Sequence, residues 1–263
     1  MTPLRDAAIA VVDVESARGA QETENAICQL GIVRMTATGL QRWAGLVNPG
    51  MPIDPAMTAI HGIDDDAVRH APPIEALMQS STIRSLFDGA TPAAFNAAFD
   101  RRFVPVEGTW LCSMRRLYHL DPGQESYDLE SATKRWDIPL TRAHDADADA
   151  HATALLTRRL MDRYLETGYT DDIDALVRFA EAPIRHERIA FGQHRGERYD
   201  TLPSEYLHWI LTGSALGSDP DIAYTVREVL NERVAIVPAP RFGATKSLSL
   251  RDRLAQKAAA LTL

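Results

Sequence analysis

The chain has 263 residues, enough for one large domain or two, and its apolar content of 45% is that of an ordinary globular protein. No apolar run approaches the roughly 18 residues that cross a bilayer, and the N-terminus lacks the layout of a secretory signal, so we expect no membrane association. Two distant cysteines form neither a disulfide framework nor a zinc-binding spacing, which fits a cytoplasmic protein. The formal net charge of −8 argues weakly against a nucleic-acid ligand, because contacts to phosphate normally use basic residues.

The first half of the chain predicts the strands of one sheet. Residues 7–14 form a continuous apolar run, which is typical of a central strand covered on both faces. Residues 26–35 and 40–47 follow as two further strands, separated by a turn-like Thr-Ala-Thr-Gly sequence. Short apolar runs at 92–97 and 109–114 add two more candidate strands.

Helices are expected between and after these strands. They are expected within residues 52–61, 64–86, 98–103, 127–136 and 145–166. Two prolines at 72–73 break the segment 64–86 into shorter pieces, so 145–166 is the longest single helix expected, and its apolar residues recur with the period of a helix. Together these elements predict an α/β fold, with a mixed central sheet flanked by helices.

The pattern changes after Gly168. Residues 169–186 are expected to form a connector, which ends near a proline. Residues 187–235 are expected to form a small helical module, and 236–263 a tail with five basic residues against one acidic. The expected organisation is therefore a main domain over 1–168, the connector, the module and the basic tail.

The module carries a glycine-rich segment at 191–196, followed by Tyr199, Tyr206 and Trp209. Two interpretations of these aromatics are open. They could stack bases beside a phosphate-binding loop, or they could form the core of the module. We favour the core interpretation.

Two carboxylates stand at the end of the first predicted strand. Asp13 and Glu15 are two positions apart, so their side chains project from the same face. Like charges placed together repel unless a cation or a shared proton lies between them. A third carboxylate, Asp100, follows the fourth predicted strand.

A further pair, His144 and Asp149, opens the longest predicted helix. Five positions would put them on different faces of one regular helix, so we expect His144 just ahead of it and Asp149 one turn inside, facing inward. Asp147 is out of phase with the buried face, whereas Asp145 is in phase and is not excluded by periodicity. Four acidic ligands with one imidazole suit paired divalent cations and a general base for phosphodiester hydrolysis.

These motifs resemble the DEDDh family of 3′→5′ exonucleases. The matching patterns are Asp-x-Glu at 13–15, Asn-x-x-Phe-Asp at 96–100 and His-x-x-x-x-Asp at 144–149. A loop at 47–63, which contains Ile-His-Gly-Ile, resembles the family's loop beside the terminal nucleotide. The likeness covers roughly residues 6–215, and its motifs are specific only jointly.

The resemblance implies a ribonuclease H-like exonuclease fold with a small α-rich C-terminal extension. It also implies two Mg²⁺ ions, or Mn²⁺, and a histidine general base at His144. The implied metal ligands are Asp13, Glu15, Asp100 and Asp149. The implied catalytic residues are His144 and Glu15. The family spacing selects Asp149 rather than Asp145.

The resemblance further implies that His61 and Ile63 lie beside the substrate and that Asn96 orients the backbone near Asp100. Gln29 stands where relatives often carry glutamate, which leaves the substrate preference open. No protein partner or oligomeric state is indicated.

Three functions remain open at this point. The first is a metal-dependent 3′→5′ exonuclease that releases nucleoside 5′-monophosphates from single-stranded or 3′-ended DNA, in DNA repair or end-trimming. The second is a 3′→5′ exoribonuclease, because the sequence shows no decisive reader of the RNA 2′-hydroxyl. The third is an inactive nucleic-acid-binding module, against which the complete acidic set argues.

Overall fold

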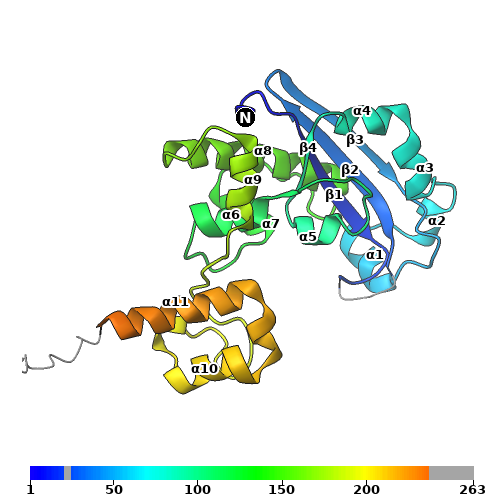
Figure 1. Ribbon diagram of the computed structural model, residues 1–263. Coiled ribbons are helices and arrows are strands. Elements are labelled where there is room, and N and C mark those ends of the chain that lie inside the picture. Colours follow the sequence, from blue (N-terminus) through cyan, green and yellow to red (C-terminus); the bar gives the residue numbers. More distant parts are fainter. Residues whose placement is uncertain (21–24, 237–263) are drawn as a thin grey trace, which may run out of the picture. The chain divides into compact units, whose positions relative to one another are not determined.

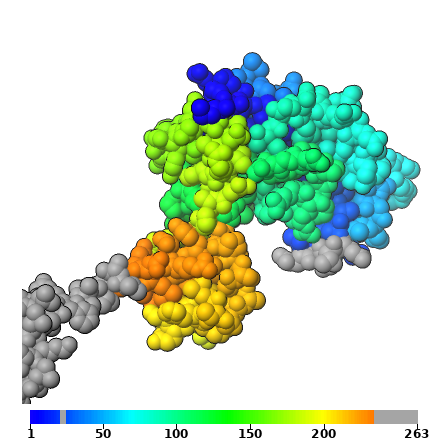
Figure 2. Space-filling view, in the orientation of Figure 1, coloured from blue at the N-terminus to red at the C-terminus, as the bar shows by residue number. Residues whose placement is uncertain are grey.

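A computed structural model describes the protein over residues 1–20 and 25–236 (Figure 1). The chain divides into two compact units, Met1–Arg185 and His186–Leu263. The space-filling view colours the first unit from blue to yellow-green and the second from yellow to orange (Figure 2). Apart from its first residue, the expected basic tail lies outside the described residues.

The first unit is built on a five-stranded mixed sheet in the order β3-β2-β1-β4-β5. The central strand β1 pairs antiparallel with β2 and parallel with β4, which confirms the predicted mixed sheet. The strands are β1 (Ile9–Ser16), β2 (Ile27–Thr36), β3 (Gly39–Leu46), β4 (Thr91–Ala94) and β5 (Leu111–Cys112).

Strand β1 is apolar on both faces because helices cover both sides of the sheet (Figure 1). Ile9 and Val11 join the core beneath α8, whereas Val12 and Val14 join the core on the other face. Since side chains alternate along a strand, Asp13 and Glu15 continue the row of Ile9 and Val11. Both carboxylates are therefore on the face that α8 covers.

The helices of the first unit pack around this sheet. Helix α8 is the longest of them and buries the face that carries Leu156 and Leu160. The helices are α1 (Pro55–His61), α2 (Asp65–Val68), α3 (Ile74–Gln79), α4 (Ser81–Phe87), α5 (Ala97–Asp100), α6 (Ser113–Leu120), α7 (Leu129–Arg135), α8 (Ala146–Glu166) and α9 (Ile173–Glu181).

Most of the segment expected as a connector is part of the first unit. Residues 173–181 form α9, and Ile173, Leu176 and Ala180 are buried in the same core as α8. The backbone N–H of Ile173 also donates to the carbonyl of Thr2, which ties the N-terminus to this helix. The division between the units falls after Arg185 rather than at the start of α9.

The second unit has a small core of its own, formed by Ile189, Tyr199, Leu202, Leu207, Ile210, Val226 and Val229. Its elements are η1 (Tyr199–Thr201), α10 (Ser204–Gly213), η2 (Ala215–Ser218) and α11 (Pro220–Ile236). Within the described ranges of the chain, no helix is both long and apolar enough to cross a membrane.

Candidate active site

The site is assembled at the C-terminal part of β1. Glu15 is only 9% exposed and Asp100 only 4%, although both carry ionisable groups. The backbone N–H of Val14, between the two acidic residues of β1, lies close enough to the Asp100 carboxylate to lower its pKa, against the larger effect of burial. The helical turn α5 therefore delivers Asp100 directly to the edge where Asp13 and Glu15 lie.

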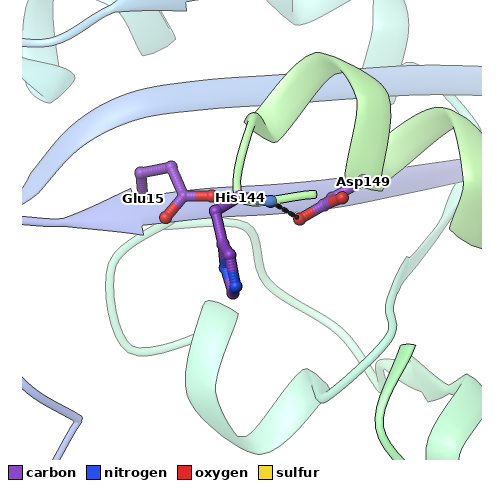
Figure 3. Close-up of side chains that lie close together, drawn as sticks. All are labelled: Glu15, His144 and Asp149. Atoms are coloured by element: carbon purple, nitrogen blue, oxygen red, sulfur yellow. Dashed lines mark hydrogen bonds between the residues drawn. The ribbon is translucent and has the colours of Figure 1, made fainter. Parts of the chain in front are cut away.

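His144 and Asp149 arrive from the start of α8 (Figure 3). His144 lies ahead of the helix, as expected, with a left-handed φ of 60° and an exposed ring. Its backbone N–H donates to Asp149 Oδ2 at 3.0 Å, which fixes the turn between the two residues. Asp145 caps the helix, since its Oδ1 accepts the N–H of Ala148 at 3.2 Å, and it pairs with Arg142 at 3.3 Å.

Three of these residues form a group that fits a metal ion. Glu15, His144 and Asp149 each offer one ligand atom, and these atoms lie within 4.8 Å of one another (Figure 3). Asp149 Oδ1 is buried and has no hydrogen-bond partner among the described residues. A buried carboxylate oxygen without a donor is costly unless a cation satisfies it, so the site fits a divalent ion. Asp13 and Asp100 adjoin this group but are not among its three members in the described part of the chain.

The electrostatics of the carboxylates agree with this interpretation. Burial raises the pKa of Glu15 to about 8, that of Asp100 to about 7 and that of Asp149 to about 6. Burial also raises the pKa of Asp13 well above its ordinary value, and the charges of Asp100, Asp149 and Glu15 raise it further. Without a cation, these groups crowd negative charge into a desolvated space.

Strand β2 holds the start of α8 in place. Gln29 Oε1 accepts the backbone N–H of Ala146 at 3.0 Å. A Cβ atom at Gly31 would lie 2.0 Å from the carbonyl oxygen of Ala146, so only glycine allows this approach. We did not predict either contact. A glycine inside a buried strand is the one signal in the sequence that indicates such a close backbone approach.

The loop residues expected beside the substrate lie in the interior. His61 is 4% exposed, and its Nδ1 accepts the N–H of Ile63 at 3.1 Å. The other ring nitrogen, Nε2, then carries the proton and faces the carbonyl oxygen of Ser16 at 3.3 Å. Burial lowers the pKa of His61, which keeps the ring neutral. Ile63 is buried in a small cluster with Ile53 and Val68, so a substrate contact by His61 or Ile63 stays a prediction.

Asn96 precedes α5 and is half-buried. Its carbonyl oxygen accepts the N–H of Phe99 at 2.8 Å, which begins the turn that carries Asp100. The side chain makes no capping hydrogen bond, so its own role beside the substrate stays a prediction.

Comparison with known proteins identifies related chains. The model of the family described as Exonuclease matches residues 10–157. Exodeoxyribonuclease 10 of Escherichia coli K12 is 27% identical over 223 residues, which cover 80% of this chain and 96% of that protein. The PolC-type DNA polymerase III of Caldanaerobacter subterraneus is 26% identical over 205 residues, 72% of this chain but only 14% of the polymerase.

Two solved structures share the fold. Exonuclease X in complex with 5′ overhanging duplex DNA has a TM-score of 0.55 and 26% identity, covering 65% of this chain and 99% of that one. The nuclease domain of 3′hExo, a DEDDh family member bound to rAMP, has a TM-score of 0.53 over 64% of this chain and 96% of that one. Its 13% identity supports the fold alone.

Proposed function

We propose that this chain, which belongs to the exonuclease family and is a DEDDh-type 3′→5′ exonuclease, removes nucleotides from the 3′ end of DNA. Its products would be nucleoside 5′-monophosphates. Two comparisons support DNA as the substrate, because a relative is named an exodeoxyribonuclease and a structural neighbour was solved with duplex DNA. The observation that carries the proposal is the meeting of β1, α5 and the start of α8, three distant segments, at one acidic site.

The acidic residues of the site would hold two divalent cations, Mg²⁺ or Mn²⁺. The proposed ligands are Asp13, Glu15, Asp100 and Asp149. Their oxygens are hard ligands of the kind that these ions prefer, and the unpartnered Oδ1 of Asp149 supports this assignment. When bound, such ions supply Lewis-acid chemistry, lowering the pKa of water and stabilising charge on phosphodiester oxygens.

We assign the general base to His144. Its ring is exposed, so a proton taken from the attacking water can pass on to solvent. Its backbone is held by the hydrogen bond from its N–H to Asp149, and one of its ring nitrogens lies within 4.8 Å of a carboxylate oxygen of Glu15. Glu15 would then have two roles, as a ligand and as the group that orients the attacking water.

A degradation assay tests the proposed function directly. DNA and RNA of identical sequence, each labelled at the 5′ end, are incubated with the protein in Mg²⁺ or in EDTA. We expect the DNA to shorten stepwise from its 3′ end in Mg²⁺, with no reaction in EDTA or in Asp13→Asn. Faster degradation of the RNA would favour the exoribonuclease alternative, and no degradation of either strand would favour an inactive binding module.

The proposed function also suggests a cellular role and a location. Trimming of 3′ ends is the step that this chemistry would supply to DNA repair. Cytoplasmic residence rests on the two distant cysteines, which are both unpaired and buried.

A further inference from the structure

The second unit carries a row of aromatic rings on its surface. The rings of Tyr206 and Trp209 on α10 stack with their centroids 5.5 Å apart and an angle of 26° between their planes. The ring of His194 lies 4.5 Å from that of Tyr206. Trp209 is 48% exposed, whereas Tyr199 is 2% exposed in the core of the unit. The core interpretation is therefore confirmed for Tyr199, holds in part for Tyr206, which is half-buried and packs against this core, and is wrong for Trp209.

One glycine makes room for the exposed ring. A Cβ atom at Gly213, one helical turn after Trp209, would lie 2.6 Å from Trp209 Cδ1. A Cβ atom at Gly192 would make only an ordinary contact, 3.4 Å from the hydroxyl oxygen of Tyr206. The indole therefore lies along α10 at a position that a side chain at Gly213 would occupy, which leaves its other face open to solvent.

The loop beside the row presents an uncompensated cation. Arg195 is exposed, and among the described residues its guanidinium makes no hydrogen bond or ion pair. Nearby Arg198, by contrast, is held by Asp200 and by Glu187. The loop itself is ordered by the hydrogen bond from the N–H of Gly196 to the carbonyl of Ile189 at 2.8 Å. An open aromatic face and a free guanidinium thus adjoin the same loop.

We propose that this surface, formed by His194, Arg195, Tyr206 and Trp209, binds single-stranded nucleic acid. Exposed bases would stack on Trp209 and continue the stack that Tyr206 begins, while Arg195 would contact phosphate. A free cation beside open aromatic rings complements a chain with anionic phosphates and flat bases better than it complements an apolar protein surface. The proposal rests on the proposed function, since the strand held here would be the one that the active site shortens.

Equilibrium binding of a 5′-fluorescein dT20 strand in EDTA, followed by anisotropy, tests the proposal with the full chain. Trp209→Ala should weaken binding by about 5- to 140-fold, the effect of losing one stacked base. Arg195→Ala should weaken binding several-fold. It should also reduce the slope of log K against log salt concentration by about 1, since one phosphate contact is lost. Binding of a blunt duplex by Trp209→Ala should differ by less than twofold from that of the unchanged chain, because the bases of a duplex are already stacked on one another.

Two matched controls separate this surface from general effects. Tyr169→Ala removes an aromatic of equal exposure, 49%, in the other unit, and Arg227→Ala removes an exposed charge from α11. Both should bind dT20 within twofold of the unchanged chain. Equal losses in Trp209→Ala and Tyr169→Ala, or no loss in Trp209→Ala, would overturn the proposal.

A second variant decides the question if Trp209→Ala unfolds the unit. Gly213→Ala favours the helix but displaces the indole, so it should weaken dT20 binding while the melting temperature holds or rises. If Gly213→Ala binds dT20 as tightly as the unchanged chain does, the proposal that this surface binds the strand is wrong. Hydrolysis of thymidine 5′-(p-nitrophenyl phosphate) reports on the active site separately. All these variants should hydrolyse it normally, and failure of the unchanged chain to do so would reject the proposed function alone.

Discussion

At the scale of single residues, the acidic site opposes the stability of the metal-free fold. Each carboxyl group has a higher pKa when folded than when unfolded, so the folded state binds more protons between those two values. Stability must therefore fall as the pH rises from about 4 to about 8. A bound cation reverses this effect, because it favours the ionised form of each ligand.

The melting temperature of the protein should depend on pH, and this dependence should change when a divalent cation is bound. In EDTA, we expect the melting temperature to be lower at pH 8 than at pH 5, and divalent cations should restore several degrees at pH 8. Asp100→Asn removes one buried charge, so it should stabilise the metal-free chain by about 1–2 kcal/mol at pH 8 and by little at pH 5. Scanning calorimetry measures both effects. Asp162→Asn, at an exposed position of α8, is the control, and equal shifts in the two variants would contradict the argument.

The two candidate aspartates of α8 should behave differently. Asp149→Asn should lower kcat by at least about 10³-fold, because a ligand is lost from the reaction centre. Asp145→Asn should retain most activity and stability, since asparagine caps a helix as well as aspartate does. Asp145→Ala should cost about 1 kcal/mol of stability without a comparable loss of kcat. Kinetics and thermal melts of the three variants check this, and an equal loss of kcat in both asparagine variants would refute the assignment.

Arg116 on α6 is a buried charge with no ion-pair partner among the described residues. It is fully buried, and only its Nη2 donates, to Ser113 and Thr157 hydroxyls, while Nε and Nη1 have no partner there. Burial lowers its pKa to about 10. Arg116→Met should therefore stabilise the fold by about 1–3 kcal/mol, since Ser113 and Thr157 keep their mutual bond. Denaturant unfolding measures the change, and a destabilised variant would indicate a partner for the guanidinium.

At the scale of elements, the helix and the strand with the longest regular patterns of apolar residues could be predicted from the sequence. The predicted strand at 7–14 corresponds to β1, and the predicted helix at 145–166 corresponds to α8 with a difference of one residue. The first is an apolar run of strand length, and the second repeats its apolar residues with the period of a helix over about six turns. The predicted strand at 109–114 was correct only over Leu111–Cys112, because β5 pairs with β4 for two residues and α6 then begins.

At the site, spacing within one strand predicts that Asp13 and Glu15 share a face. Asp100, His144 and Asp149 were instead selected by the resemblance to the exonuclease family. The contacts of Gln29 and Gly31 with Ala146 join residues more than 100 positions apart. A local sequence pattern carries no information about residues so far apart in the chain. These contacts could therefore be found only from the folded structure.

These contacts predict that β2 controls the position of α8. Gln29→Ala removes the hydrogen bond to Ala146 and should lower kcat by about 5- to 20-fold, because His144 and Asp149 lose their fixed position. Gln41→Ala, at an exposed position of β3, should have no effect. Gly31→Ala should be more severe, with at least a 100-fold loss of kcat, since its Cβ would displace the helix. Single-turnover kinetics measure the losses, and a fully active Gly31→Ala would contradict the proposed role of β2.

At the scale of the whole molecule, each unit has a hydrophobic core of its own. The first unit carries the site proposed for hydrolysis, and the second carries the surface proposed to hold a strand. The net charge of −8 is compatible with a nucleic-acid substrate, because several of the acidic groups lie at the proposed metal site, where bound cations would reverse the local sign. We therefore expect the local distribution of charge, rather than the total, to decide binding.

Anomalous diffraction from crystals soaked in Mn²⁺ tests the metal site most directly. We predict two peaks about 3.5–4 Å apart. Oxygens of Asp13, Glu15, Asp100 and Asp149 should lie about 2.0–2.4 Å from them. An absence of peaks there, or peaks whose ligands leave out Asp13 and Asp100, would contradict the proposal that the four carboxylates share a pair of ions.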